Sequence, residues 1–279
     1  MYLSSIVLLN KRQLSVNRSN VTWLDMAQKI TNTKLRKLNL IAAGLHFAQG
    51  IVVLLISKSF SVQITGTYLK FDKATQHLNP ATKTLFNVQL SWLIVAFFFI
   101  SAFFHLFIAT VYNGRYNRNL KLGINKARWI EYSLSASIMM VAIGLLVGIY
   151  DASSLLMIFA LISIMNLMGL VMEVHNQTTQ KTNWLSYFIG CWAGLVPWLV
   201  VAGYLALGAH MGSKAPTFVY WIFVSIFIFF SCFAINMVLQ YKKVGPWKDY
   251  LYGERVYIIL SLVAKSLLAW QVFAGTLRP

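Results

Sequence analysis

The sequence predicts an all-α membrane protein, a bundle of seven transmembrane helices with a β-hairpin-like outer loop between the first two. Of the 279 residues, 58% are hydrophobic and only 11% are charged. The apolar residues are gathered into runs of about 20, the length an α-helix needs to cross a hydrocarbon core of about 30 Å. These runs are apolar on all faces, which differs from the alternating pattern of a membrane β-barrel.

Each apolar run is expected to be a helix, because backbone groups inside lipid must satisfy their own hydrogen bonds. The seven predicted spans, in order, are Leu38–Ser57, Val88–Tyr112, Trp129–Tyr150, Ser154–Val174, Trp184–Leu207, Thr217–Tyr241 and Val256–Leu277. Most connections are short, and the link from Tyr150 to Ser154 is hardly more than a turn. Consecutive helices are therefore expected to be antiparallel neighbours in one bundle.

One connection, the outer loop over residues 58–87, is long enough to hold structure of its own. From Phe60 to Phe71 it has β-branched and aromatic residues around a central Gly66. This pattern predicts an outer strand or hairpin. The sequence leaves two interpretations open, an ordered cap without a function of its own and an assembly surface.

The net charge of +17 does not indicate nucleic-acid binding, because the basic residues lie at span ends and in loops, as orientation signals do. With a cytoplasmic N-terminus, 17 of the 24 basic residues fall on the inner side and 6 on the outer side; the remaining one is Lys265. We therefore predict a multi-pass protein of the cell membrane with its N-terminus in the cytoplasm and its C-terminus outside. Residues 1–33 are interpreted as a basic cytoplasmic tail and residues 34–279 as the helical domain.

Lys265 lies near the middle of the span Val256–Leu277, where a lysine costs about 3 kcal/mol or more on insertion scales. Charged residues at such depth are usually functional. Three chemistries could use this amine: a permanent ion pair with Glu131, ion transport, or a Schiff base formed with an aldehyde. The Schiff base accounts for more of the sequence, because its positive charge needs a counterion and Glu131 is suited to that role.

Glu131 is the one acidic residue that enters a span with clear membrane character, since the others fall in tails, loops or span ends. An alternative is an interfacial ion pair between Glu131 and Arg128, one turn away. The last span runs outward and Cα–Cβ bonds tilt toward a helix N-terminus, so the Lys265 side chain is expected to lean toward Glu131. Ser261 lies one turn before Lys265 on the same face. A carboxylate, a hydroxyl and an amine can then form one cluster.

Two histidines, His46 and His105, lie at about the depth of Lys265 when each is measured from its inner span end at about 1.5 Å per residue. Each alone is more often a helix-packing hydrogen-bond partner. Together with Glu131 they predict a hydrated pocket that holds protons, because imidazole exchanges protons near neutral pH. Two further polar residues accompany them, Ser101 and Gln49.

The sequence resembles the heliorhodopsin family in several ordered segments that together cover roughly Lys34 to Pro279. The segment Ser261–Lys265, followed by Leu268–Phe273 and Gly275–Leu277, closely resembles the seventh helix of that family. Five other segments are similar to it: Gly44–His46, Ser101–His105, Arg128–Ser135, Gly190–Trp198 and Tyr250–Arg255. One departure is Ala136, which lies in a stretch that is often fully Ser in relatives.

The resemblance implies all-trans retinal bound through Lys265, with Glu131 as counterion and with His46 and His105 in a cytoplasmic-side network that accepts the proton after illumination. It also implies a homodimer, a slow photocycle suited to sensing and a β-structured loop after the first helix. The remaining candidate pocket residues are Ser135, Met165, Gly169, Pro197, Phe227 and Phe230.

The predicted function is therefore light sensing by a retinal photoreceptor, which is neither an enzyme nor an ion pump. A pump needs proton-exchanging groups on both sides of the Schiff base, and the outer halves of the spans hold no carboxylate. The expected partners are retinal, the lipid bilayer, a second copy of the chain and an unknown cytoplasmic signalling protein. A light-gated proton channel is the main alternative, and a retinal-free transporter or receptor is a more distant one.

Overall fold

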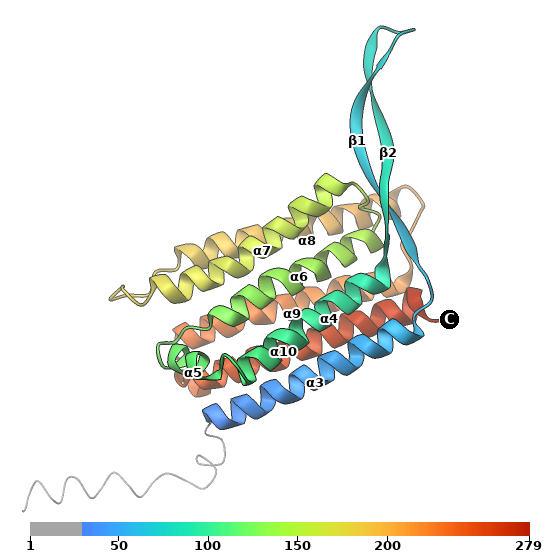
Figure 1. The fold of residues 1–279 in the computed structure, drawn as a ribbon. Coiled ribbons are helices and arrows are strands. Elements are labelled where there is room, and N and C mark those ends of the chain that lie inside the picture. Colours follow the sequence, from blue (N-terminus) through green and yellow to red (C-terminus); the bar gives the residue numbers. More distant parts are fainter. Residues whose placement is uncertain (1–29) are drawn as a thin grey trace, which may run out of the picture. The chain divides into compact units, whose positions relative to one another are not determined.

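The computed structural model describes residues 30–279, and the helical unit runs from Asn32 to Pro279 (Figure 1). Most of the predicted basic tail, residues 1–29, lies outside the described residues. Within the described part, seven helices are long and apolar enough to cross a membrane, which confirms the predicted fold class. They are α3 (Asn32–Ile56), α4 (Leu90–Ala109), α6 (Lys126–Leu146), α7 (Ala152–His175), α8 (Leu185–His210), α9 (Thr217–Tyr241) and α10 (Tyr250–Val272).

The helix boundaries differ from the predicted spans in two ways. Some helices extend into polar residues, and one predicted span includes residues that belong to the hairpin. The last helix begins at Tyr250, six positions before the predicted span, because the Asp249 side chain caps it by accepting from the Leu251 N–H at 3.0 Å. It ends in a π-helical turn, η2 (Phe273–Leu277). The second predicted span was too long, because Val88 belongs to the hairpin.

Two short helices were not predicted. A polar segment after α4 forms α5 (Asn113–Lys121), which buries Tyr116 and Leu120 on one face. These residues are four positions apart and therefore share a helix face. A 3-10 turn, η1 (Gly245–Lys248), precedes α10. We name the two ends of the bundle the α5 end and the hairpin end.

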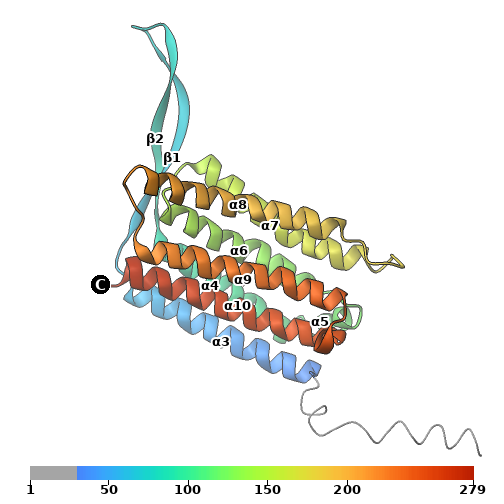
Figure 2. The same cartoon turned by 180° about the vertical axis from the view of Figure 1, so that it is seen from behind.

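The seven long helices form a bundle (Figures 1 and 2) in which helices consecutive in sequence pack on each other, except that α8 and α9 make few backbone contacts. Helix α3 packs on α4 and α10, α4 on α6, α6 on α7, α7 on α8, and α9 on α10. The tight link from α6 to α7 turns at Gly148, whose φ of 96° is a left-handed conformation that favours glycine.

The predicted outer hairpin is confirmed as a two-stranded antiparallel sheet of β1 (Ser61–Asp72) and β2 (His77–Gln89). Its register pairs Ser61 with Gln89 at the base and Asp72 with His77 at the tip, with a bulge between Ile64 and Thr65. The base is anchored on the bundle, because Ile64 is buried and the Thr65 N–H donates to the Tyr150 carbonyl at 2.9 Å. The rest of the hairpin projects away from the helices (Figure 1).

The interior of the bundle is apolar toward the hairpin end and polar toward the α5 end. The largest apolar cluster includes Leu90, Ile143 and Leu277, which lie near the hairpin-end termini of α4, α6 and η2. In contrast, Glu173 and Glu254 are buried in the α5-end turns of α7 and α10. The candidate site lies where these two regions meet.

Candidate functional site

The predicted contact between Lys265 and Glu131 is present in the structure. The Lys265 Nζ lies 3.1 Å from the Glu131 Oε1, and both side chains are only 4% exposed. The same ammonium donates to the Ser261 Oγ at 2.6 Å, which uses the serine one turn earlier on α10. A charge buried at this depth is stable only with an oppositely charged partner and further hydrogen bonds, and this arrangement supplies both.

Two hydroxyls from different helices fix the Glu131 carboxylate. Its Oε1 accepts from the Ser101 Oγ on α4 at 2.6 Å and from the Ser135 Oγ on α6 at 2.7 Å. Ser101 and Ser135 are fully buried, so these bonds are made away from water. The structure thus brings together Lys265, Glu131, Ser261, Ser101 and Ser135 from three helices. The cluster can hold a positive charge at the Lys265 Nζ, and a proton can be held by either Lys265 or Glu131.

The two predicted histidines stack on each other one turn further toward the α5 end. The rings of His46 and His105 are nearly parallel, with centroids 5.5 Å apart. The His105 Nδ1 pairs with the Asn39 Oδ1 at 2.7 Å, which requires the proton on Nδ1 because an amide oxygen accepts. Both His46 nitrogens and the His105 Nε2 are buried without a hydrogen-bond partner among the described residues. In the neutral rings, one His46 nitrogen and the His105 Nε2 can therefore accept a proton, and the other His46 nitrogen is an unpartnered donor.

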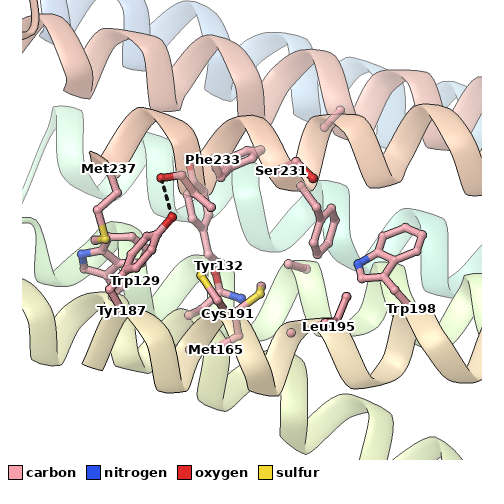
Figure 3. Close-up of a pocket in the computed structure, with 18 of the residues that line it drawn as sticks. Trp129, Tyr132, Met165, Tyr187, Cys191, Leu195, Trp198, Ser231, Phe233 and Met237 are labelled. Atoms are coloured by element: carbon pink, nitrogen blue, oxygen red, sulfur yellow. Dashed lines mark hydrogen bonds between the residues drawn. The ribbon is translucent and has the colours of Figure 1, made fainter. Parts of the chain in front are cut away.

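Next to Lys265 the bundle holds a cavity of about 320 Å³, lined by residues of α6, α7, α8, α9 and α10 (Figure 3). Lys265 and Ser261 line it, as do four further predicted pocket residues, Met165, Gly169, Phe227 and Phe230. Figure 3 shows Trp129 toward one end of the cavity and Trp198 toward the other.

The cavity fits a long apolar aldehyde bound to the lysine. Its volume lies in the range of pockets for small organic ligands, and its wall is built mainly from aromatic rings, methionines and glycines. At Gly194 an added Cβ would collide with the Met165 sulfur, and at Gly169 it would collide with the Trp129 ring. These glycines leave space that other side chains occupy, so the wall is closely packed. Retinal, an apolar polyene aldehyde, matches this site in polarity and in reactive group.

Two predicted site residues, Gln49 and Pro197, belong neither to the polar cluster around Lys265 nor to the cavity wall. The Gln49 Oε1 accepts from the Trp270 Nε1 at 2.9 Å, and its amide donates to the Leu45 carbonyl, so it connects α3 to α10. Three positions beyond His46 on the helix, it is rotated from the histidine face toward α10. Pro197 is buried inside α8 and is not among the residues that line the cavity.

The alternative ion pair between Arg128 and Glu131 is wrong, because Arg128 pairs with two other carboxylates. Its guanidinium contacts Glu173 on α7 and Glu254 on α10, and all three side chains are 2–3% exposed. We call Arg128, Glu173 and Glu254 the buried ion network. The sequence alone predicts Glu173 and Glu254 only as span-end residues, because nothing local shows that two helix ends turn them toward one arginine.

Neutral donors complete the buried ion network. Glu173 accepts from the Asn125 backbone N–H at 2.8 Å, the Trp129 Nε1 at 2.7 Å and the Tyr250 hydroxyl at 2.9 Å. Glu254 accepts from the Asn125 Nδ2 at 2.6 Å and the Tyr116 hydroxyl at 3.2 Å. Tyr116 is outside the spans, and burial raises the pKa of its phenol well above the ordinary value, so it acts as a donor.

Sequence comparison places the chain in a known family. Residues 35–277 match the family model described as Heliorhodopsin. No curated protein matches the chain by sequence at a significant level.

Two solved structures share the fold at low identity. One is a light-driven proton pump from Leptosphaeria maculans, with a TM-score of 0.60 and 14% identity over 88% of this chain and 96% of that one. The other is a cyanorhodopsin from the cyanobacterium Tolypothrix sp. NIES-4075, with a TM-score of 0.55 and 13% identity over 89% of this chain and 96% of that one.

Proposed function

The chain belongs to the heliorhodopsin family, and from that premise we propose that this retinal photoreceptor is a light sensor that binds all-trans retinal as a Schiff base on Lys265. Glu131 is the proposed counterion. The observation that carries the proposal is the Lys265 amine, which lines an apolar cavity and has a carboxylate 3.1 Å behind it. Retinal supplies the absorption of visible light and a change of isomer, and the chain supplies the environment in which a proton at that nitrogen is held or lost.

The residues around Lys265 support both holding and releasing a proton. The Glu131 carboxylate stabilises a positive nitrogen, and its two serine hydroxyls keep the accepting oxygen in place. The buried histidine pair lies on the α5 side of this carboxylate, and each neutral ring has one unpartnered nitrogen that can accept a proton. A proton that leaves Lys265 Nζ can thus be held at Glu131 Oε1 or at a histidine nitrogen.

The hairpin half of the bundle argues against vectorial pumping. Beyond Ser135 on α6 the interior is occupied by Met139, Met140 and Ile143, which are buried in the apolar cluster. Among the described residues, the hairpin-end halves of the seven helices carry no Asp or Glu. Among the described residues, the buried carboxylates and histidines, which are the groups that exchange protons, lie on the α5 side of Lys265. We infer that the return of a proton to Lys265 is slow and that the deprotonated form lives long enough to signal.

The same asymmetry separates the sensor from a light-gated proton channel, which needs a polar path through both halves.

A homodimer and a cytoplasmic signalling partner complete the proposal. The partner would bind at the α5 end, which faces the cytoplasm in the predicted topology and carries exposed basic residues such as Arg115 and Arg118.

The first test is the visible absorption spectrum of the purified full-length protein after addition of all-trans retinal. A band far to the red of free retinal is expected for the parent protein and for Lys214→Ala, an exposed lysine control at the hairpin end. Lys265→Ala should lose the band and Glu131→Gln should shift it. A band that persists in Lys265→Ala would refute the assigned attachment site.

The second test separates sensing from ion transport. Membranes that contain the pigment should show no sustained photocurrent at zero voltage and no voltage-dependent proton current under light. A current at zero voltage would establish a pump, and a current that reverses with voltage would establish the channel.

A further inference from the structure

We propose that Trp129 is a positioning residue that couples the cavity to the buried ion network, so that a change in the cavity alters how α6, α7 and α10 are held at the α5 end. The inference rests on the proposed function for the source of that change, the light-driven rearrangement of the retinal. The structural basis is that the Trp129 side chain contacts both the cavity and the buried ion network. Trp129 lines the cavity and also hydrogen-bonds a carboxylate of the buried ion network.

On the cavity side, the Trp129 ring occupies the space left by a missing side chain on α7. An added Cβ at Gly169 would collide with three carbons of the indole six-membered ring. The indole is only 6% exposed and makes edge-to-face contacts with Tyr132 and Tyr257. A ring held on all sides moves only when its neighbours move, because protein interiors are closely packed.

On the network side, the Trp129 Nε1 donates to the Glu173 Oε2 at 2.7 Å. The same oxygen accepts the Asn125 N–H, while the other oxygen binds Arg128 and the Tyr250 hydroxyl. An indole is rigid, so the ring atoms that face the cavity and the Nε1 that faces Glu173 move together. Displacing the ring therefore breaks or bends a hydrogen bond to a buried charged group, which is among the stronger kinds in proteins.

A second connection runs from the same cavity wall. Tyr132 lines the cavity with the Lys265 Nζ 5.1 Å from its ring centre. Its hydroxyl donates to the Tyr257 backbone carbonyl at 2.9 Å. The Tyr257 ring in turn lies 3.9 Å from the guanidinium carbon of Arg128. Both aromatic residues of α6 thus lead from the cavity to the buried ion network.

The opposite end of the cavity has contacts of another kind. Trp198 packs edge to face against Phe223, Phe227 and Phe230, with ring centroids 5.3–5.6 Å apart. Such apolar contacts tolerate small displacements better than a hydrogen bond to a buried carboxylate does. Trp198 is therefore a matched control for Trp129: the same residue type in the same cavity without a contact to the buried ion network.

The buried ion network is suited to respond in discrete steps. It joins α6, α7 and α10 through Arg128, Glu173 and Glu254, all removed from water. A buried carboxylate cannot lose a donor without a large cost, so the network keeps one arrangement until another becomes favourable as a whole. Elements with two discrete arrangements are the physical basis of coupling between distant sites.

The first experiment uses the retinal-free full-length chain and a double-mutant cycle on its thermal unfolding. Trp129→Phe keeps an aromatic ring and removes the Nε1 donor, and Glu173→Gln weakens the acceptor. We expect the two reductions in Tm to be non-additive, the double variant losing clearly less than their sum. The reductions for Trp198→Phe and Glu173→Gln should add. Additive behaviour of Trp129→Phe with Glu173→Gln would overturn the proposal.

The second experiment measures light-induced movement at the α5 end. Spin labels are placed through Lys121→Cys on α5 and Lys181→Cys after α7, both exposed positions, in a background of Cys191→Ser and Cys232→Ser. We expect illumination to change the distance distribution in the retinal-loaded parent and in Trp198→Phe. In Trp129→Phe the change should fall several-fold while the visible band is kept.

An equal change in Trp129→Phe, or no change in a parent that shows the band, would overturn the coupling. A parent without any visible band would instead refute the proposed function. The unfolding cycle, which needs no retinal, decides the contact between Trp129 and Glu173 independently.

Discussion

At the residue scale, two kinds of buried ion pair lie within two turns of α6 and have different surroundings. Glu131 pairs with Lys265, which lines the cavity, and Glu131 is further fixed only by hydroxyls. Arg128 pairs with Glu173 and Glu254, and none of these three lines the cavity. The first pair is placed where a ligand can change its protonation. The second does not border the cavity itself, and it joins α6, α7 and α10.

Replacing the arginine of the buried ion network should strongly destabilise the fold. Arg128→Gln would leave two buried carboxylates without their cation, and breaking a buried pair in this way costs about 3–5 kcal/mol. The exposed Arg115→Gln on α5 is the control and should change stability by no more than about 0.5 kcal/mol. Denaturant unfolding in detergent measures both. Equal stabilities of the two variants would contradict a structural role of the buried ion network.

Two glycine substitutions test the packing of the cavity wall. Gly169→Ala should destabilise the retinal-free protein by about 1–3 kcal/mol, because the added methyl group would overlap the Trp129 ring. Gly44→Ala on α3 has nothing within 4 Å of the new Cβ and should be neutral or stabilising by up to about 1 kcal/mol. Thermal unfolding of both variants checks the prediction. A Gly169→Ala variant as stable as the parent would show that the Trp129 ring can shift to accommodate the methyl group.

At the element scale, α7 is fixed at both ends. At its start, Asp151 accepts from the Ser154 N–H at 3.0 Å, next to Tyr150, whose carbonyl accepts from the hairpin. At its end, Glu173 belongs to the buried ion network. A helix held at two ends can rotate or bend only between them, and that part carries Met165 and Gly169 at the cavity.

The cap of α7 should make stability depend on pH. Hydrogen bonds from the Ser153 hydroxyl and the Ser154 backbone N–H lower the pKa of Asp151 below its ordinary value. A lowered carboxyl pKa stabilises the fold above the unfolded-state value of about 4, and this contribution is lost as the pH falls through the lower folded-state value.

Asp151→Ala should therefore lower Tm at pH 7, and its difference from the parent should shrink below about pH 4. Asp151→Asn, which can still cap without ionising, should show a smaller loss at pH 7. Thermal unfolding of the three proteins between pH 3 and pH 8 provides the measurement. A constant difference across this range would show that the Asp151 charge contributes nothing.

At the scale of the whole molecule, the bundle is divided into an apolar hairpin half and a polar α5 half. The buried charged groups lie from the middle of the bundle to the α5 end, whereas the main apolar cluster fills the hairpin half. In the proposed function, a proton that leaves Lys265 is therefore expected to move toward the α5 end. The distribution of basic residues predicts that this end faces the cytoplasm.

Accessibility labelling tests this orientation. With the background cysteines replaced by serine, Lys121→Cys at the α5 end should be protected from an impermeant thiol reagent in intact cells. Lys83→Cys on the hairpin should react. Both positions are exposed in the structure, so a difference reflects the side of the membrane. The reverse pattern would invert the predicted topology and the direction of proton release.

The sequence by itself determined the seven spans, the hairpin and the two residues on which the proposed function depends. These features are readable because their cause is local. Hydropathy over about 20 residues defines a membrane helix, and a charge such as Lys265 within one is too costly to be incidental. The contacts of Lys265 with Glu131 and Ser261 followed from depth and from helix periodicity.

Only the tertiary structure decided how the helices are rotated against one another, and hence which side chains meet. Arg128 pairs with Glu254, 126 residues away, and with Glu173, 45 residues away, rather than with Glu131 on its own helix. Rotation likewise turned Gln49 toward Trp270 and away from the histidines. The cavity and the contact of Trp129 with Glu173 depend on close packing between helices, which is a property of the assembled bundle and not of any single span.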